Sequence, residues 1–596
     1  MKLRKSLIAI LVLSIALLPG CSSKTVEKQV TQNQETQQPV ASTDVKESNG
    51  NVDETIGVQP AIVLNQLGYL PTATKKVIFR IGEEGDAFDV VDVGTNEVVY
   101  TGKLGEKIYS EGDGQFCFVG SFSEVTKPGQ YKIVSEKYGN SYHFTIEEDV
   151  YKEVFKEAVR FFYYQRCGVE LTKEYGGEWA HPVCHSEMAT IYGTDKKIDV
   201  SGGWHDAGDY GRYVVATSKA VADLMLAYEA NPEAFTDDFN IPESGNGIPD
   251  VLDEVKHQLQ WLLKMQDQTS GGVYHKVTCA DFPDIDVMPQ DETDELIVCP
   301  ISTTATGDFV AVMSMGYELY QDIDKDLANQ CLEAAKLGWE YLKKAPASTV
   351  DNPEGIVTGA YNDSMDQDER FWATVQLFKA TGDEQYHKEI KGMMDTFTNE
   401  QNPIVGYGWQ TVASYGLDGY LACKNTDPEA RKAAETFQIE YAEYCMRNMI
   451  KGDAYEITTR GYDFYWGSNM AILSVANVLE LADELTQSNN FHEYAVERVN
   501  YCFGKNPLGI CYVTGFGTVY PKYPHHRPSV ATSKTIPGMI IGGANANLED
   551  DVVKDKLNGK PAAQCYIDDY LSYSTNETDI YWNSSLVYAL AKLKLV

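Results

Sequence analysis

The sequence predicts a small all-β domain followed by a large all-α domain, and two patterns along the chain support this. Short runs within residues 57–147 alternate apolar and polar residues between glycines and prolines, as in an antiparallel sandwich of the immunoglobulin-like type. From Val150 onward the apolar residues follow helical spacing. No run of strands alternates with these helices, so a parallel sheet is not expected.

The first twenty residues are typical of an export signal. A basic start precedes a short apolar run at residues 6–18, which is too short for a comfortable membrane span. The run ends in LPGC, residues 18–21, which resembles the bacterial lipobox. This resemblance implies a signal peptide over residues 1–20, a lipid on Cys21 and anchoring at the bacterial cell surface or outer membrane. Ordinary signal cleavage with a secreted product is the alternative.

Residues 21–56 are rich in Thr, Gln, Ser and Glu and almost free of aromatic side chains. Such a segment cannot bury enough apolar area to offset the entropy lost on ordering. We therefore expect a flexible tether. No later stretch has the apolar length of a membrane helix, so the membrane is expected to be a partner only through the N-terminal lipid.

Charge and cysteine content narrow the function classes. The formal net charge of −37 argues against nucleic acid or anionic lipid as a partner, because both require basic patches. An acidic surface suits an outer-face protein acting on a neutral substrate, and we expect a monomer. The twelve cysteines lack the dense spacing of a disulfide scaffold, so many of them should be buried as small apolar residues.

The helical domain is expected over residues 150–596, after a sandwich over residues 57–147. About a dozen helices would fit this length, and helices of this number could pair into a closed barrel, although periodicity alone does not prove closure. Ten segments show the spacing directly: 150–167, 250–266, 303–319, 328–345, 369–381, 384–397, 430–449, 469–485, 491–504 and 584–594.

Two carboxylates stand three residues apart in GGWHDAGDYGRYVV, residues 202–215. Asp206 and Asp209 have small and aromatic neighbours. They could belong to a surface turn, since Asp and Gly are ordinary turn residues. They could also be a catalytic base and a supporting carboxylate.

A second acidic motif lies near the C-terminus, where Glu577 has Tyr573, Tyr581 and Trp582 close by in the sequence. A carboxyl group packed among aromatic rings loses hydration and its pKa rises, which suits a general acid near neutral pH. The alternative is a glutamate that complements the dipole at the start of a helix.

Between these motifs, residues 503–529 form a Gly- and Tyr-rich stretch that contains His525 and Arg527. Sugars bind to flat aromatic faces and directed hydrogen-bond donors, and this stretch offers both. Trp466 is a candidate sugar platform, with a core tryptophan at a helix start as the alternative.

Together these motifs resemble glycoside hydrolase family 9, the inverting cellulases. Its three signatures are similar to GGWHDAGDYGRYVV, VTGFGTVYPKYPHHR and NETDIYWNSSLVYALA, in the same order. Residues 61–79, AIVLNQLGYLPTATKKVIF, resemble the immunoglobulin-like domain that precedes the catalytic domain in one branch of the family. The resemblance covers residues 58–596 and implies an (α/α)6 barrel that hydrolyses β-1,4-glucosidic bonds in β-glucan or cello-oligosaccharides.

The resemblance also implies a role for each matching residue. Asp209 would be the base that activates water, Asp206 would orient that water, and Glu577 would protonate the departing glycosidic oxygen. The remaining roles, contacts with the sugar, would fall to His525, Arg527, Tyr581 and Trp582.

Simple geometry agrees with this assignment. An inverting enzyme keeps its two carboxyl groups roughly 6.5–9.5 Å apart so that a water fits between them and the sugar. Asp206 and Asp209 are too close in sequence to be that pair unaided. A distant acid must complete it, and Glu577 is the best candidate.

Two metal sites are expected. Cys167, Cys184, His185 and His205 form the two-thiolate, two-imidazole set of a closed, structural zinc site, and match a zinc site in the immunoglobulin-bearing branch of the family. Two free thiols and two surface histidines are the alternative.

The acidic loop at residues 361–372 suits calcium, which prefers hard oxygen ligands. By resemblance to a family loop, the ligands would be Ser364, Asp368 and Glu369. Met365 replaces the glycine usual after that serine, and an ordinary solvated acidic loop is the alternative.

Three other functions stay open. Exo-acting members of the same family cut cellodextrins, act as β-glucosidases or cut glucosamine oligomers. A non-catalytic glycan-binding lipoprotein would not need Asp206, Asp209 and Glu577 together. A zinc peptidase would need an open coordination position and the HExxH motif, which does not occur in the sequence.

Overall fold

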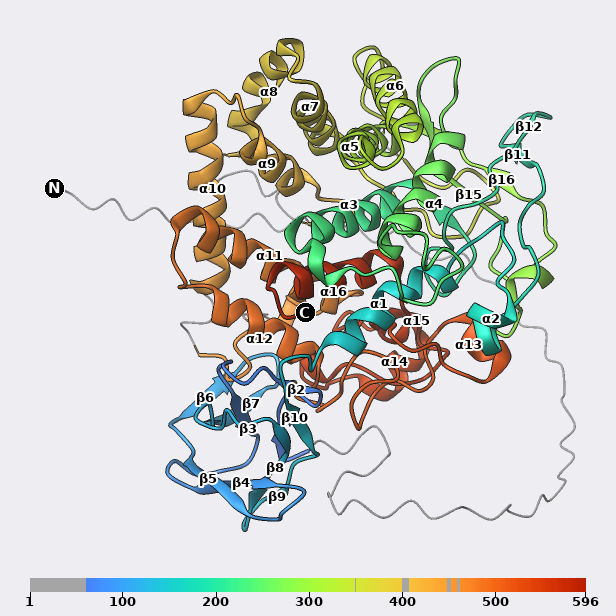
Figure 1. Cartoon of the computed structure of the whole chain (residues 1–596). Coiled ribbons are helices and arrows are strands. Elements are labelled where there is room, and N and C mark those ends of the chain that lie inside the picture. The colour runs from blue at the N-terminus through green and yellow to red at the C-terminus, as the bar shows by residue number, and fades with distance from the viewer. Residues whose placement is uncertain (1–59, 349, 399–406, 448–451, 458–460) are drawn as a thin grey trace, which may run out of the picture. The chain divides into compact units, whose positions relative to one another are not determined.

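The computed structural model describes residues 60–348, 350–398, 407–447, 452–457 and 461–596. The expected signal peptide, the lipidated Cys21 and the tether lie outside these residues. Figure 1 shows strands at the start of the described chain and mainly helices after them. Among the helices of these ranges, none combines the length and the apolar character that a bilayer span requires.

Two sheets form the β-sandwich that the sequence alternation predicts. One has the strand order β1-β3-β7-β6 and the other β2-β10-β8-β4-β5, with β9 paired to β8. Every second side chain of β8 is buried, in a core that includes Phe88 and Tyr131. The strands are Ile62–Val63 (β1), Gly68–Tyr69 (β2), Lys76–Phe79 (β3), Ala87–Asp92 (β4), Val98–Lys103 (β5), Lys107–Ser110 (β6), Gln115–Ser121 (β7), Gly129–Ser135 (β8), Gly139–Asn140 (β9) and Phe144–Ile146 (β10).

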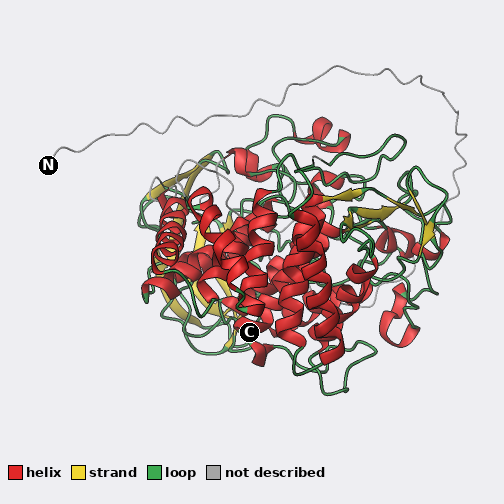
Figure 2. Cartoon of the chain, turned by 90° about the horizontal axis from the view of Figure 1, so that it is seen from above, coloured by secondary structure: helices red, strands yellow, loops and turns green. Residues whose placement is uncertain are grey.

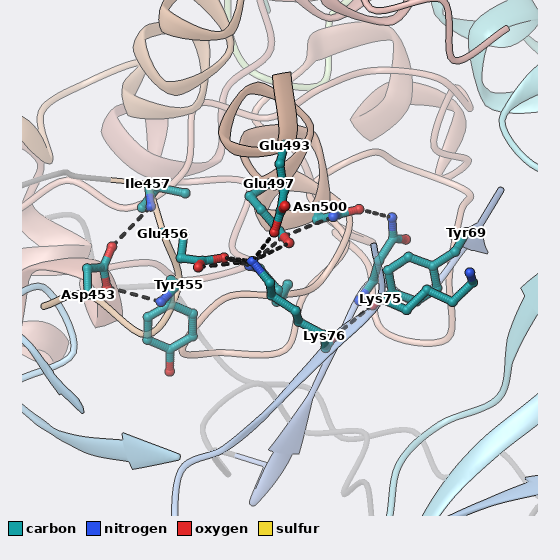
Figure 3. Close-up of polar contacts among 12 residues, drawn as sticks. Tyr69, Lys75, Lys76, Asp453, Tyr455, Glu456, Ile457, Glu493, Glu497 and Asn500 are labelled. Carbon is teal, nitrogen blue, oxygen red and sulfur yellow. Dashed lines mark hydrogen bonds and ion pairs between the residues drawn. The ribbon is translucent and has the colours of Figure 1, made fainter. Parts of the chain in front are cut away.

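A network of charged groups, mostly shielded from solvent, joins the sandwich to the helices. Figure 3 shows the Lys76 ammonium group, from β3, beside Glu456, Glu493 and Glu497. The shortest N–O distances to these three carboxylates are 2.7, 2.5 and 3.6 Å. Glu497 also pairs with Lys505 at 2.5 Å, and both of these side chains are buried. The acidic groups outnumber the lysines, so loss of one lysine would leave buried negative charge uncompensated.

Apolar packing continues across the same junction. Val63, Ile78 and Cys117 belong to the sandwich, yet they lie in one continuous apolar core with the helices. The Gln66 amide nitrogen also donates to the Gly509 carbonyl at 2.7 Å. The sandwich is therefore an integral support of the helical domain.

Twelve helices of the described chain form an (α/α)6 barrel, which confirms the predicted fold class. Six of them make the inner ring, in which α16 contacts α3, α3 contacts α5, α5 contacts α7, α7 contacts α9, and α11 contacts α16. These inner helices are Val214–Ala230 (α3), Thr303–Tyr320 (α5), Gln367–Thr381 (α7), Ala413–Ala422 (α9), Ser468–Thr486 (α11) and Ile580–Lys592 (α16).

The other six helices lie outside this ring, and they alternate with the inner helices along the chain. Each packs on an inner helix: α1 on α16, α4 on α3, α6 on α5, α8 on α7, α10 on α9 and α12 on α11. Figure 2 shows the helices packed alongside one another. The outer helices are Lys152–Tyr164 (α1), Asp250–Lys264 (α4), Lys325–Leu342 (α6), Glu384–Phe397 (α8), Pro428–Arg447 (α10) and His492–Cys502 (α12).

Two inner helices, α3 and α9, were not among the ten predicted segments. In α3 every side chain from Val214 to Met225 is buried, so no polar face marks the helical period. The outer helix α8 shows the opposite pattern, because its buried residues include Tyr386, Ile390 and Met394 at helical spacing. A helix enclosed on all sides loses the periodic signal on which the sequence prediction depends.

Short strands and helices shape the loops between the long helices. One small sheet has the order β12-β11-β16-β15-β13, and β14 pairs with β17. β13, the last strand in the order of the first of these sheets, leads directly into α3. These short elements are Ala189–Ile191 (β11), Lys197–Ile198 (β12), Arg212–Tyr213 (β13), Val273–Tyr274 (β14), Lys276–Thr278 (β15), Ile297–Val298 (β16), Ile301–Ser302 (β17), Lys173–Gly176 (α2), Arg527–Thr532 (α13), Asp551–Leu557 (α14) and Tyr573–Asn576 (α15).

Candidate active site

The candidate catalytic residues lie in loops that precede inner helices. Asp206 and Asp209 come shortly before α3, and Glu577 comes directly before α16. Tyr361 precedes α7 and Trp466 precedes α11. The N-terminal end of a helix carries a partial positive charge, so this placement favours negative charge in the site.

A glycine-rich turn positions the two aspartates. The Asp206 backbone N–H donates to the Gly211 carbonyl at 3.0 Å, which closes the turn. A Cβ atom at Gly208 would lie 2.1 Å from the His525 carbonyl oxygen, so only glycine allows this approach. The aspartates are 2% and 5% exposed, which rules out the surface-turn alternative.

Tyrosine hydroxyls hold both carboxylates. Asp209 Oδ2 accepts from the Tyr213 hydroxyl at 2.8 Å and from the Gly211 N–H at 3.2 Å. Asp206 Oδ2 accepts from the Tyr361 hydroxyl at 2.5 Å. No group of the described residues hydrogen-bonds to Asp206 Oδ1, which is buried.

Backbone pairing brings Glu577 to this turn. His525 and Glu577 form an isolated parallel bridge, in which the His525 N–H donates to the Asn576 carbonyl at 2.8 Å. Two residues later, the Arg527 N–H donates to the Gly208 carbonyl at 3.2 Å. The segment at 525–527 therefore connects the aspartate turn to Glu577, although these motifs are far apart in sequence.

The pKa values of the two expected catalytic groups are both raised. Burial raises the pKa of Glu577 well above its ordinary value, and the Asp209 charge raises it further, while Arg527, the Gly208 N–H and the Trp466 side chain lower it. Burial also raises the pKa of Asp209, against the lowering effect of Arg527. Glu577 is thus suited to hold a proton while a neighbouring acid carries charge.

Arg527 and His525 are held by carbonyl groups. The Arg527 guanidinium donates to the Gly208 carbonyl at 2.8 Å and to the Pro283 carbonyl at 2.9 and 3.1 Å. His525 Nδ1 lies 2.7 Å from the Tyr570 carbonyl, and burial lowers the pKa of His525 to about 4. Arg527 therefore braces two loops with its donors, and His525 is neutral near pH 7.

Exposed aromatic rings flank Glu577. Trp466 is 39% exposed, and its ring centroid lies 5.2 Å from that of Tyr573. The Tyr573 ring is also 6.1 Å from the His525 ring. Trp466 is therefore accessible as a sugar platform beside Glu577, and its alternative as a core residue is excluded.

Burial bears on the sugar contacts that were expected of the two aromatic residues after Glu577. Trp582 is 2% exposed, and a Cβ atom at Gly467 or Gly542 would lie within 3.0 Å of its indole. Tyr581 is also buried, with its ring 6.3 Å from that of Tyr361 in the site. Trp582 is therefore packed at the start of α16, whereas the sugar contact of Tyr581 stays a prediction.

Four residues that the sequence motifs did not single out complete the site. Tyr213 and Tyr361 hold the aspartates, and the Trp409 ring lies 4.9 Å from the Tyr361 ring. Asp579 Oδ2 lies 3.1 Å from the Tyr361 hydroxyl. Tyr213 and Asp579 lie inside the two acidic motifs, which is the signal that could have found them, whereas Tyr361 and Trp409 lie outside both motifs.

The four predicted zinc ligands converge. One ligand atom from each of Cys167, Cys184, His185 and His205 lies within 4.8 Å of all the others, and all four residues are buried. His205 Nε2 lies 3.7 Å from the Cys184 sulfur and 3.3 Å from His185 Nδ1. The other ring nitrogen of His185, Nε2, lies 2.9 Å from the Glu292 carboxylate. This donor set fits tetrahedral zinc, including the carboxylate that commonly orients a histidine ligand.

The predicted calcium loop meets a carboxylate from another helix. Asp368 and Glu369 are buried, whereas Ser364 is exposed. Asp308, on α5, is also buried and raises the pKa of Glu369, although less than burial and Asp368 do. In the described chain, neither Asp308 nor Glu369 has a hydrogen-bond partner for its carboxylate oxygens. Because these carboxylates are buried, the solvated-loop alternative does not hold for them.

Comparison with known families separates the same two domains. Residues 151–590 match the family described as "Glycosyl hydrolase family 9". Residues 57–140 match the "Cellulase N-terminal ig-like domain". The two matches follow one another along the chain and together span most of the described residues.

Individual relatives agree with these matches. A cellodextrinase of Butyrivibrio fibrisolvens is 35% identical over 550 residues, which cover 89% of this chain and 99% of the relative. Endoglucanase D of Acetivibrio thermocellus is 32% identical over 563 residues, which cover 92% and 85%. The crystal structure of a single-mutant thermostable endoglucanase from Alicyclobacillus acidocaldarius superposes with a TM-score of 0.83, at 35% identity, and covers 89% of this chain and 99% of that one. The chain therefore belongs to glycosyl hydrolase family 9, with the cellulase-type immunoglobulin-like domain in front of its catalytic barrel.

Proposed function

We propose that this glycoside hydrolase cleaves β-1,4-glucosidic bonds in cellulose-type glucans or cellodextrins with inversion of configuration. The observation that carries the proposal is the meeting of Glu577 with the Asp206–Asp209 turn at the inner-helix N-termini. One of these groups is suited to give a proton and another to take one. That pair is the minimum requirement of inverting glycoside hydrolysis.

In the proposed reaction Asp209 takes a proton from a water molecule as the water oxygen attacks the anomeric carbon. The bond from that carbon to the glycosidic oxygen breaks, and Glu577 gives its proton to the departing oxygen. Asp209 ends protonated and Glu577 ionised, so one proton exchange with solvent restores both groups. His525 and Trp466 would contact the sugar on the Glu577 side.

Asp206 would position the attacking water. Its Oδ2 is committed to the Tyr361 hydroxyl, whereas no described group occupies Oδ1. A buried carboxylate oxygen without a protein partner is a suitable acceptor for a water proton. Asp206 and Asp209 together would then fix both hydrogens of the water and direct its lone pair at the sugar.

The relatives bear on substrate choice. They include a protein named cellodextrinase and one named endoglucanase, so both short and long β-glucans are reasonable substrates. We expect soluble or amorphous β-glucan and cello-oligosaccharides rather than crystalline cellulose.

The deciding experiment follows cellohexaose hydrolysis by NMR. Inversion requires the new reducing end to appear first as the α-anomer, followed by mutarotation. First appearance of the β-anomer would contradict the proposed pair of roles. Viscosity loss on carboxymethylcellulose, compared with release of reducing ends, separates endo from exo action: a rapid loss of viscosity indicates endo cleavage.

We also propose structural zinc at Cys167, Cys184, His185 and His205. All four positions of a tetrahedral ion would be filled by protein, which leaves none for a substrate or a water. His205 precedes Asp206 directly, so zinc would stiffen the turn that holds the catalytic aspartates.

Calcium is proposed beside Asp368 and Glu369, with Asp308 as a further carboxylate that the loop sequence alone did not indicate. Buried carboxylates without hydrogen-bond partners require protons or a cation to offset the cost of burial. The exposed Ser364 would contribute only through its backbone or a rearranged side chain. The ion would join α5 to α7.

Export and anchoring remain proposals that rest on the N-terminal sequence. A lipid on Cys21 would place the enzyme at the cell surface, where it would act as a monomer on glucans outside the cell. Labelling with a fatty-acid probe, lost in Cys21→Ala, tests this directly.

A further inference from the structure

Asp579 is a third buried carboxylate at the site, beyond the pair that hydrolysis requires. It is 3% exposed and caps α16, where its Oδ1 accepts from the Tyr581 N–H at 3.1 Å. Its Oδ2 lies 3.1 Å from the Tyr361 hydroxyl. A helix cap accounts for Oδ1 but not for the contact between Oδ2 and the Tyr361 hydroxyl.

The Tyr361 hydroxyl lies close to two carboxyl groups. Its hydroxyl carries one hydrogen, yet it lies 2.5 Å from Asp206 Oδ2 and 3.1 Å from Asp579 Oδ2. The shorter distance is typical of a hydroxyl donating to an ionised carboxylate, so the Tyr361 hydrogen belongs on the Asp206 side. The Asp579 contact is then a hydrogen bond only if Asp579 supplies the hydrogen.

The groups around Asp579 favour a proton on its carboxyl. Burial raises the pKa of Asp579 well above its ordinary value, and the nearby carboxylates Asp206 and Glu577 raise it further, while the Tyr581 N–H and the Tyr361 hydroxyl lower it. The cation that faces it from α3 is Lys219, whose ammonium group is already paired with Asp223 at 2.5 Å. Burial and the Asp209 charge raise the pKa of Asp206 as well, so it is the 2.5 Å contact with Tyr361 that assigns the ionised form to Asp206 and the proton to Asp579. Lys219 does not replace that proton, because it is already paired.

We propose that Asp579 is a positioning residue that carries a proton, donates it to the Tyr361 oxygen, and thereby fixes the Tyr361 hydrogen on Asp206. Asp206 is then held through one oxygen and keeps the other for the attacking water. The inference rests on the proposed function, because it assigns a task to Asp206 in water activation. It differs from a purely structural cap, which would be indifferent to protonation of Oδ2.

Two substitutions test the proposed proton of Asp579 separately from its role as a helix cap. Asp579→Asn keeps the cap and can donate from its amide nitrogen to Tyr361, so it is expected to lose no more than about threefold in kcat. Asp579→Ser also caps a helix well but is too short to reach Tyr361, so kcat should fall about tenfold or more with little change in KM. Equal losses of kcat in the two variants would overturn the proposal.

The pH profile gives a reading that a structural cap would not change. In the wild type, the contact with Tyr361 is broken when Asp579 loses its proton as the pH rises. Asn cannot ionise, so the ratio of kcat in the wild type to kcat in Asp579→Asn should fall as the pH rises through the alkaline limb, whether Asp579 or Glu577 ionises first. A ratio that does not change with pH would contradict the proposed proton.

Stability tests the same proton without reference to activity. A carboxyl that is protonated in the folded chain and ionised in the unfolded chain loses stability as pH rises above about 4. The Tm of Asp579→Asn should therefore exceed that of the wild type by a margin that grows from pH 4 to pH 7. A margin that shrinks over this range would show that Asp579 is ionised, whatever reaction the enzyme performs.

Discussion

At the scale of single residues, the proposed mechanism needs Glu577 and Asp209 in opposite protonation states at the same pH. Their surroundings provide this through burial and mutual repulsion rather than through a strongly basic partner. Arg527 lowers the pKa of both acids, and three of its five N–H groups donate to the carbonyls of Gly208 and Pro283. The arginine therefore opposes the effect of burial, yet the pKa of each acid stays raised.

Substitution of Glu577 tests its proposed role as the general acid. Glu577→Gln has nearly the same shape but cannot protonate the leaving group, so kcat on cellohexaose should fall by about 10²–10⁴-fold. Asp209→Ala should lose a comparable factor, and Asp206→Ala should also be impaired. All three variants should keep the circular dichroism of the wild type. Wild-type turnover in Glu577→Gln would contradict its role as the acid.

The pH dependence of kcat/KM tests the balance between the two carboxyls. The proposed mechanism requires Asp209 ionised and Glu577 protonated, so kcat/KM should rise through the pKa of the base and fall through that of the acid. Burial raises the pKa of both groups, most strongly for Glu577. The alkaline limb should therefore lie well above the ordinary glutamate range of about 4.3. An alkaline limb within that range would show that a different group is the acid.

The proposed catalytic carboxylates could be singled out from the sequence because each lies in a dense local motif. Tyr361 was not, since it opens an acidic loop that suggests only a metal site, and its task depends on a contact with Asp206 155 positions away in the sequence. Trp582 was predicted to contact sugar because it is an aromatic residue close after the proposed acid. It is instead buried on α16, among the residues that form the barrel.

At the scale of elements, the outer helices were predictable and two inner helices were not. An outer helix keeps one apolar face, whereas an inner helix such as α3 is covered on every side. The convergence of Cys184 with His205 was predictable as a ligand set, but only the folded loops show that the donors meet.

Zinc gives a testable prediction for the loop before α3. A zinc-selective chelator should lower the Tm of the wild type, because bound metal stabilises the fold by mass action. Cys184→Ser should have a lower Tm already and show no further shift with chelator. Cys299→Ser, another buried cysteine outside the cluster, should still respond. An unchanged Tm in chelated wild type, with zinc removal verified by elemental analysis, would argue against a structural ion.

The charge network that joins the sandwich to the helices gives a second prediction at this scale. Lys76→Ala removes a cation from among three glutamates and should lower the free energy of unfolding by about 3 kcal/mol, as expected for a broken buried pair. Lys137→Ala is the matched control, because its ion pair with Asp86 is at the surface and should contribute no more than about 1 kcal/mol. Denaturant unfolding measures both, and equal losses would contradict the importance of the network.

At the scale of the whole molecule, the sandwich and the barrel share one interior. A chain that begins at Val150 would expose the helical side of the core around Val63, Ile78 and Cys117. We expect this truncated chain to aggregate or to unfold at a Tm at least about 10 °C lower, since each lost kcal/mol shifts Tm by a few degrees in a large domain. A truncated barrel with unchanged Tm and activity would show that the two domains are independent.

The alternation of inner and outer helices has a consequence for biosynthesis. The aspartate turn belongs to the first helix pairs, whereas Glu577 and Asp579 precede the final helix of the ring. A growing polypeptide therefore carries most of its helices before it possesses the proposed proton donor. Premature termination before Glu577 would also remove α16, whose side chains from Ile580 to Ala591 are buried, so the product would lack both the acid and one inner helix of the barrel.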